Sequence, residues 1–445
     1  MGAGTIASGN YSTAMGIGAT ASGLRSFAVG DNANSTAEES FSFGESVTAS
    51  GSNSITLGQF NEASGVLSVA IGSQLTSSSQ SSTAFGYGST AIGNYSTATG
   101  NTTTASGYAS TAMGAGTIAS GGFSTAMGAV TTASGNYSTA MGVSTIASGS
   151  VSTAMGDLSA ATGYASTAMG ASSTASGDYS FAIGQGTDSD GNTSSGTPYY
   201  TNEALGIRSF VIGSRNKATG DKSFTVGNDN LSQGYGSGTF GENNITLGDY
   251  SFSIGLFSES IAYGSVSIGN NAIADGYNTI AIGTANTIDS NASPDEWNQS
   301  NRAFVIGNGV YDDESATLTR SDAFTVWFNG DATLAGNLNI NSDARLKANI
   351  ISLGGTLSKL LQIDGKSYTM KKDESEKQKI GVLAQDIEKV FPELISESNG
   401  VKSVNYQGLI PVLINALKEQ QSEIEIYRNE VSELKEMVQA LASRD

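Results

Sequence analysis

Ser342 and Lys347 lie five positions apart and are of types that together allow nucleophilic chemistry. A serine hydroxyl is a weak nucleophile and needs an adjacent base. A lysine amine serves as that base only when it is uncharged, a form that desolvation or a nearby positive charge favours. By itself the spacing is ordinary, and an alternative is that Ser342 or Asp343 caps a short helix running to Ile350. The role of the pair therefore depends on its surroundings.

Other catalytic constellations are missing from the sequence. The 445 residues include no Cys and no His. Thiolate metal sites, disulfides, His-based catalytic triads and the commonest metal ligand are therefore excluded. Paired carboxylates of the kind that glycosidases use are not visible either. We predict no cofactor and no metal.

The Ser–Lys pair opens a segment of distinct composition, residues 342–445, in which Lys and Glu replace Gly and Ser. Its last part contains apolar residues that are alternately three and four positions apart, which is the spacing of a coiled coil. We predict a helix from about Leu409 to Ala442 that ends the chain. Seven of the eight seam positions are apolar, and the eight are Leu417, Gln420, Ile424, Tyr427, Val431, Leu434, Val438 and Leu441.

Three stretches of this segment follow one another in order: SDARLK at 342–347, IGVLAQDIEKVFPEL at 380–394 and VNYQGLIPVLINALKE at 404–419. With these stretches the segment resembles the intramolecular chaperone domain that ends endosialidase tailspikes and many phage fibres. The resemblance implies an α+β domain that assembles as a trimer, assists folding of the fibre before it and then cuts itself off.

The same resemblance implies roles for single residues. Ser342 would be the nucleophile, Lys347 the base, and Asn341–Ser342 the cut bond, while Asp343 and Arg345 match motif positions and are candidates for supporting roles. Three assembled chains would bury Lys347 and favour its uncharged form, whereas an unassembled chain would leave it protonated. We therefore expect that cutting depends on trimer formation. This single self-cleavage is the only enzymatic activity that we predict, with no external substrate.

Residues 1 to about 284 repeat with a period of fourteen. Gly occupies every fourteenth position from Gly2 to Gly184, and the pattern resumes from Gly213 to Gly283. Five-residue stretches such as Ser-Thr-Ala-Met-Gly at 124–128 alternate with period two, which predicts short strands separated by glycine at tight corners. Ser and Ala face one side of such a strand and Thr and Met the other. We predict that the Thr and Met side fills a narrow core.

The pattern Ser-x-Ala-hydrophobic-Gly at this spacing resembles the head repeats of trimeric autotransporter adhesins. The resemblance implies a mostly β fold, a trimeric left-handed parallel β-roll with 14-residue coils, and a single-chain solenoid is the alternative. Residues 1–9 recur unchanged at 113–121, so we expect that the chain begins in mid-repeat and that an upstream part is missing.

Five segments follow from these patterns. The β-roll covers residues 1–184 and 206–284, and an irregular insertion at 185–205 separates its two parts. A neck and β junction follows at 285–341, and the chaperone domain with its coiled coil covers 342–445. The aromatic residues of Pro198-Tyr199-Tyr200 in the insertion and Trp297 in the neck either contact a receptor or glycan or cap the roll, and for the neck we favour the structural role. Asn329-Gly330 between alternating stretches predicts a hairpin.

Charge and composition narrow the partners and the function. The net charge is −19, of which −17 belongs to residues 1–341, and this disfavours nucleic acid as a partner. No apolar run of 18 residues exists, so we predict no membrane insertion. We predict a homotrimeric adhesive or receptor-binding fibre that binds a host cell-surface receptor or glycan. Its location is the virion, as a phage tail fibre, or the extracellular cell surface. Alternatives are a bacterial surface adhesin with the same modules or a glycan-degrading tailspike.

Overall fold

The computed structural model describes residues 2–185, 201–371 and 377–443. The chain divides into two compact units, Met1–Asn337 and Leu338–Asp445, which are described separately. The predicted contact of Pro198-Tyr199-Tyr200 lies outside the described residues.

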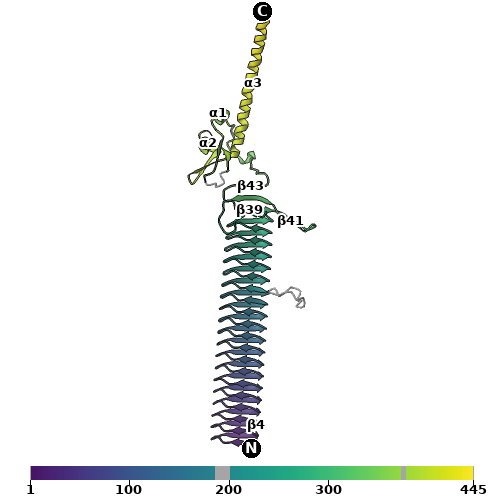
Figure 1. The fold of residues 1–445 in the computed structure, drawn as a ribbon, viewed down its shortest axis with the longest axis vertical. Coiled ribbons are helices and arrows are strands. Elements are labelled where there is room, and N and C mark those ends of the chain that lie inside the picture. Colours follow the sequence, from purple (N-terminus) through teal and green to yellow (C-terminus); the bar gives the residue numbers. More distant parts are fainter. Residues whose placement is uncertain (1, 186–200, 372–376, 444–445) are drawn as a thin grey trace. The chain divides into compact units, whose positions relative to one another are not determined.

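Most of the first unit is a parallel β-solenoid, in which coils stack on one another (Figure 1), and one coil is longer, since Phe181 of β26 pairs with Phe210 of β28. Each coil contributes one short strand and one five-residue strand, and each kind forms its own parallel sheet. Equivalent residues of successive coils pair in register, so that Thr125 lies opposite Thr139 and Ala126 opposite Ala140. The sheet of short strands has 19 members. The predicted roll of 14-residue coils is confirmed.

The long strands are β2 (Thr13–Ile17), β4 (Phe27–Asp31), β6 (Phe41–Glu45), β8 (Ile55–Gln59), β10 (Val69–Ser73), β12 (Thr83–Tyr87), β14 (Thr97–Asn101), β16 (Thr111–Ala115), β18 (Thr125–Ala129), β20 (Thr139–Val143), β22 (Thr153–Asp157), β24 (Thr167–Ala171), β26 (Phe181–Gln185), β28 (Phe210–Ser214), β30 (Phe224–Asn228), β32 (Gly238–Glu242), β34 (Phe252–Leu256), β36 (Val266–Asn270) and β38 (Ile280–Thr284). The short strands are β1 (Ile6–Ala7), β3 (Thr20–Ala21), β5 (Asn34–Ser35), β7 (Thr48–Ala49), β9 (Glu62–Ala63), β11 (Thr76–Ser77), β13 (Thr90–Ala91), β15 (Thr104–Ala105), β17 (Ile118–Ala119), β19 (Thr132–Ala133), β21 (Ile146–Ala147), β23 (Ala160–Ala161), β25 (Ser173–Ala175), β27 (Asn202–Ala204), β29 (Lys217–Ala218), β31 (Leu231–Ser232), β33 (Ile245–Thr246), β35 (Glu259–Ser260) and β37 (Ile273–Ala274).

Small side chains line the interior of the solenoid. In one coil, Thr117 and Ala119 of the short-strand side and Ser124 and Ala126 of the long-strand side are at most 1% exposed. Met113, on the other side of its long strand, is 44% exposed. The prediction that the Thr and Met side of the long strand fills the core is therefore wrong for the single chain. Because protein interiors are close-packed, two sheets separated in this coil by Ala, Ser and Thr leave no room for a methionine between them.

One series of periodic glycines, represented by Gly128, lies within the long strands with positive φ, whereas a second series, represented by Gly121, lies at the predicted corner between a short and a long strand. Gly128, the fourth residue of β18, has a φ of +119°, and a Cβ at this position would lie 2.0 Å from the carbonyl oxygen of Gly142 in the next coil. The left-handed corner positions are mostly held by residues other than glycine, such as Tyr95, Thr102 and Phe123 with φ of 60°, 52° and 58°, although Gly116 occupies one of them with a φ of 63°. Stacking fixes these left-handed turns, because each one hydrogen-bonds to its neighbour along the solenoid.

The sheet of long strands reverses direction at the end of the solenoid. β39 (Arg302–Asn308) pairs in parallel with β38 and antiparallel with β42 (Asp322–Trp327). β42 and β43 (Ala332–Leu334) form the predicted hairpin around Asn329-Gly330. A second hairpin joins β40 (Val310–Asp312) to β41 (Thr317–Thr319).

The neck loop between β38 and β39 packs on the last coils. The backbone N–H of Tyr263 donates to the carbonyl of Pro294 at 3.0 Å, and Trp297 lies 6.3 Å from Phe328 between ring centroids. Arg302, which is 4% exposed, donates two hydrogen bonds to the Asp275 carboxylate at 2.8 and 2.6 Å. These contacts fit the structural role that we favoured for the neck.

The second unit is a small α+β structure that continues into one long helix. Its core contains the buried side chains of Ile387, Phe391 and Val412. Its last helix begins at Leu409 and ends at Ala442, as predicted, and is 34 residues long. Its elements are a 3-10 helix (Ala344–Leu346), α1 (Leu357–Leu360), β44 (Lys366–Tyr368), β45 (Lys379–Gly381), α2 (Ala384–Val390), a 3-10 helix (Pro392–Leu394), β46 (Ile395–Ser398), β47 (Val401–Val404), a 3-10 helix (Tyr406–Gly408) and α3 (Leu409–Ala442).

Candidate active site

Ser342 and Lys347 lie at the two ends of the 3-10 helix Ala344–Leu346 and are in contact. The amine Nζ of Lys347 donates a hydrogen bond to Oγ of Ser342 at 2.7 Å. The helix is held by backbone bonds from Leu346 N–H to the Asp343 carbonyl at 3.0 Å and from Lys347 N–H to the Ala344 carbonyl at 3.1 Å. This single turn reverses the chain enough for the lysine side chain to reach back over it.

Asp343 is the N-cap of this turn. Its Oδ1 accepts a hydrogen bond from the backbone N–H of Arg345 at 2.9 Å, and its Oδ2 accepts one from the guanidinium NH2 at 2.6 Å. The Arg345 side chain, followed by its backbone N–H, lowers the pKa of the Asp343 carboxyl, and Asp343 in turn raises the pKa of Arg345. The capping alternative is thus correct for Asp343. The helix ends at Leu346, however, and does not run to Ile350.

The site is open to solvent in the single chain. Every residue from 332 to 355 is exposed, including Asn341, Ser342 and Lys347. Within one chain, burial therefore supplies no desolvation that would favour an uncharged amine. The sequence-predicted residues are brought together, but the surroundings that base chemistry requires must come from elsewhere.

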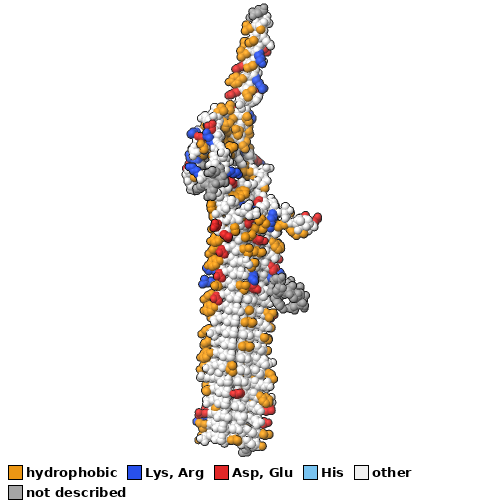
Figure 2. Space-filling view, viewed as in Figure 1, with side chains coloured by type: hydrophobic (Ala, Val, Ile, Leu, Met, Phe, Trp, Pro, Cys, Tyr) orange, Lys and Arg blue, Asp and Glu red, His pale blue; other side chains and the backbone are white. Residues whose placement is uncertain are grey.

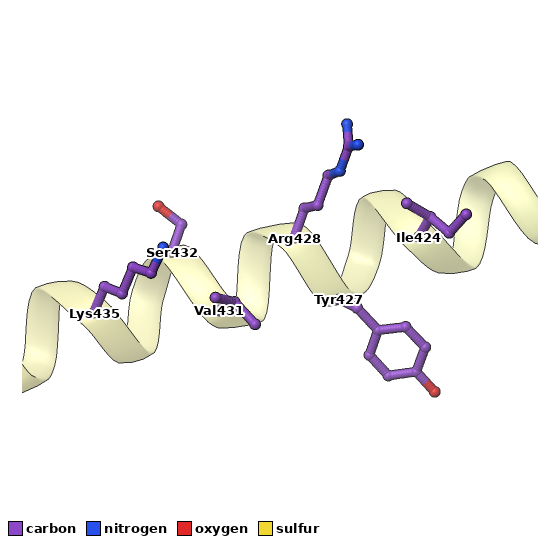
Figure 3. Close-up of a pocket in the computed structure, with 6 residues that line it drawn as sticks. All are labelled: Ile424, Tyr427, Arg428, Val431, Ser432 and Lys435. Atoms are coloured by element: carbon purple, nitrogen blue, oxygen red, sulfur yellow. The ribbon is translucent and has the colours of Figure 1, made fainter.

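The helix α3 leaves almost its whole surface exposed. Its buried residues are Val412 and Ala416, both near its start. The predicted seam residues Leu417, Tyr427 and Leu441 are 64%, 63% and 64% exposed. A pocket lies on this helix, and Figure 3 shows Tyr427 on one side of the ribbon and Arg428 on the opposite side. Its lining residues are Ile424, Tyr427, Arg428, Val431, Ser432 and Lys435, all from α3.

The outer side of the solenoid carries half-exposed apolar side chains and few charges. Phe43, Met113, Phe240 and Ile268, each the third residue of a long strand, are 51%, 44%, 41% and 40% exposed. On the side seen in Figure 2, hydrophobic side chains line the two long edges of the solenoid, and charged ones are sparse between them. An apolar surface of this length is typical of a contact surface.

Sequence reasoning missed a ladder of aromatic side chains along one corner of the solenoid. Tyr95, Tyr108, Phe123 and Tyr137 occupy this corner in four successive coils, with ring centroids 5.5, 5.3 and 5.1 Å apart. In the sequence, this ladder corresponds to an aromatic residue one or two positions before the serine that precedes each of these four long strands. A second ladder consists of Tyr235, Tyr250, Tyr263 and Tyr277.

Among the residues that the structure describes, no helix is both long and apolar enough to cross a membrane. In the same part of the chain, no group of three or more His, Cys, Asp or Glu is placed to hold a metal ion.

Two protein families match this chain. Residues 342–396 match the family described as Chaperone of endosialidase. The YadA head domain repeat matches seven segments, which are 7–33, 48–74, 77–103, 105–130, 133–159, 161–187 and 260–286.

The chain is also similar to the long tail fiber protein Gp37 of Salmonella phage S16. The two are 26% identical over 169 residues, which cover 36% of this chain and 21% of the relative. The chain thus spans about a fifth of the length of that relative. Together with the two families, this similarity points to a fibre-type protein. The chain combines YadA head repeats with a C-terminal endosialidase-type chaperone domain.

Proposed function

We propose that this chain forms a homotrimeric receptor-binding fibre of the phage tail-fibre type, in which the second unit assists assembly and then releases itself by cleavage between Asn341 and Ser342. The family matches and the similarity to a phage long tail fiber protein support the fibre and its place on the virion. The ligand is a receptor or glycan on the host cell surface.

The trimer is supported by two unpartnered apolar surfaces of the single chain. One is the outer side of the long strands, and the other is the seam of α3. Full burial of a Leu, Ile or Val side chain contributes about 1.5–3 kcal/mol, so that seven apolar seam positions per chain provide a large driving force for helix association. We expect Leu434→Asp to abolish trimer formation by α3 and the neighbouring Glu433→Gln, off the seam, to preserve it. Native mass spectrometry distinguishes the two outcomes.

The observation that carries the cleavage proposal is the 2.7 Å hydrogen bond from Lys347 Nζ to Ser342 Oγ. In the uncharged form the amine accepts the hydroxyl proton as Oγ attacks the carbonyl carbon of Asn341. The C–N bond to Ser342 then breaks, and the proton passes to the departing amino group. This leaves an ester between Asn341 and the serine oxygen, which water hydrolyses to a carboxyl group and a free hydroxyl.

The solvent exposure of Ser342 and Lys347 in the single chain explains why cleavage would depend on trimer assembly. Both residues are exposed in the single chain, so that water surrounds the amine there. Sister chains that cover the turn would remove water from it and favour the uncharged form. Cleavage then occurs only after the three chains have met.

The test is denaturing electrophoresis and mass analysis of the purified protein. We expect a fragment that begins at Ser342, and its absence from Ser342→Ala and Lys347→Ala variants that still form trimers. The cleavage rate of the wild type rises with pH, since general-base catalysis requires an unprotonated base. A Lys347→Ala variant that cleaves at full speed, or a stable lone chain that never splits, contradicts the proposal.

A bacterial cell-surface adhesin is the second candidate, and the seven matches to the adhesin head repeat favour it. Antibodies against the solenoid distinguish the two by labelling either virions or uninfected cells. A glycan-degrading tailspike is the third, and release of reducing sugar from host polysaccharide by the purified trimer tests it.

A further inference from the structure

The turn that carries the Ser–Lys pair lacks support from packing. All residues from 332 to 355 are exposed, so no buried side chain anchors Ser342 or Lys347 from behind. A 3-10 helix of three residues is weak because its hydrogen-bond geometry is poor. Something local must therefore hold Nζ of Lys347 near Oγ of Ser342.

The side chain of Asp343 provides that local support. Its Oδ1 accepts a hydrogen bond from the backbone N–H of Arg345, the second residue of the turn, at 2.9 Å. The Arg345 guanidinium donates hydrogen bonds to both carboxylate oxygens of Asp343. Its Nε lies 3.1 Å from each oxygen, and its NH2 lies 2.6 Å from Oδ2. Because a bidentate interaction between a guanidinium and a carboxylate is directional, Arg345 holds the Asp343 carboxylate in the rotamer that the N-cap requires.

We infer that Asp343 is a positioning residue for self-cleavage, which acts by capping the turn that brings Lys347 to Ser342. This inference rests on the proposed function, and it explains how Ser342 and Lys347 of the proposed cleavage site are held close together. Asp343 takes no proton in the reaction, because both of its oxygens accept hydrogen bonds from Arg345. Without the cap, the turn frays and the amine spends less time against the hydroxyl, so the cleavage rate falls in proportion.

The experiment measures the first-order rate constant of cleavage in freshly synthesised full-length protein. Only the trimeric fraction of each variant is used for this measurement. Loss of an N-cap lowers the population of the formed turn by about fivefold, and the cleavage rate falls with that population. We expect Asp343→Ala to cleave about five- to tenfold more slowly than the wild type. Asp343→Asn retains a capping oxygen, and we expect a rate within about twofold of the wild type.

The control is Asp364→Ala. Asp364 forms an ion pair with Lys366 two positions later, the same separation as in Asp343 and Arg345, but it lies elsewhere in the unit. We expect the control to cleave at the wild-type rate. The pH at which the rate reaches half its maximum is the same in the wild type, Asp343→Ala and Asp343→Asn, because none of these changes alters the base.

Two results overturn the inference. One is an Asp343→Ala trimer that cleaves at the wild-type rate. The other is an Asp343→Asn trimer that is as slow as Asp343→Ala, with a displaced pH profile, since the negative charge itself would then act on the reaction. Both leave the proposed function standing as long as the wild type cuts and Lys347→Ala does not. A wild type that never cuts refutes the proposed function instead.

Discussion

A methyl group added to a single glycine should separate two coils of the solenoid. Gly128 has a φ of +119°, and the Cβ of an alanine there would lie 2.0 Å from the Gly142 carbonyl oxygen. Real Cβ atoms essentially never come within 3.0 Å of such an atom, so the two backbones must part by about an ångström or more. That displacement breaks hydrogen bonds of the ladder between β18 and β20.

The cost of Gly128→Ala can be worked from these terms. The unfavourable φ contributes about 1–3 kcal/mol, and each lost ladder hydrogen bond contributes about 1 kcal/mol. With two or three bonds lost, we expect destabilisation of about 3–6 kcal/mol per chain. Because each coil of a solenoid contacts only its neighbours, the damage stays at the interface between the two coils.

Hydrogen exchange of peptides that cover residues 111–143 measures this local opening, and two nearby glycines serve as graded controls. Gly116 has a φ of +63° with the nearest atom at 3.8 Å, so Gly116→Ala should cost only about 1–2 kcal/mol. Gly122 has no positive φ and its nearest atom lies at 3.4 Å, so Gly122→Ala should be nearly neutral. Equal exchange in Gly128→Ala and Gly122→Ala would refute the proposed close approach of the coils.

Two further predictions concern the second unit. Because Lys347 Nζ meets Ser342 Oγ within one chain at 2.7 Å, mixed trimers of Ser342→Ala and Lys347→Ala chains should stay uncut, and a cut product on denaturing gels would show that the pair is shared between chains. The backbone N–H of Thr356 and then that of Leu357 lower the pKa of the Glu419 carboxyl below its ordinary 4.5. Glu419 therefore stabilises the docking of α1 on α3 above pH 4.5, and this contribution is lost as the pH falls through the lowered pKa. The protection of residues 356–360 against hydrogen exchange, taken relative to the intrinsic exchange rate at each pH, should fall on acidification in the wild type and change less in Glu419→Gln, whereas identical pH responses would contradict the assignment.

The period of the solenoid and the existence of its strands were readable from the sequence. Glycine at fourteen-residue intervals and two-residue alternation are local regularities, and stacking in register follows from them. The bounds of α3 and the Asn329-Gly330 hairpin were readable for the same reason. The Ser342 and Lys347 pair was also found from sequence, through its motif.

Other features could not be predicted from the sequence, because they depend on contacts between segments that are far apart in the chain. Alternation establishes that the two faces of a strand differ, but the separation of the two sheets decides which face is inside, and here Ala, Ser and Thr fill most interior positions, with Asn, Val and Leu75 at the others. The carboxylate of Glu419 reaches the start of α1 across 63 positions, which no local pattern encodes. The sequence thus determined the repeat, the secondary structure and the reactive residue types. The tertiary structure decided which side chains are buried, which residues turn the corners, and that Lys347 meets Ser342 in an exposed turn, because these depend on distances between segments that sequence spacing does not set.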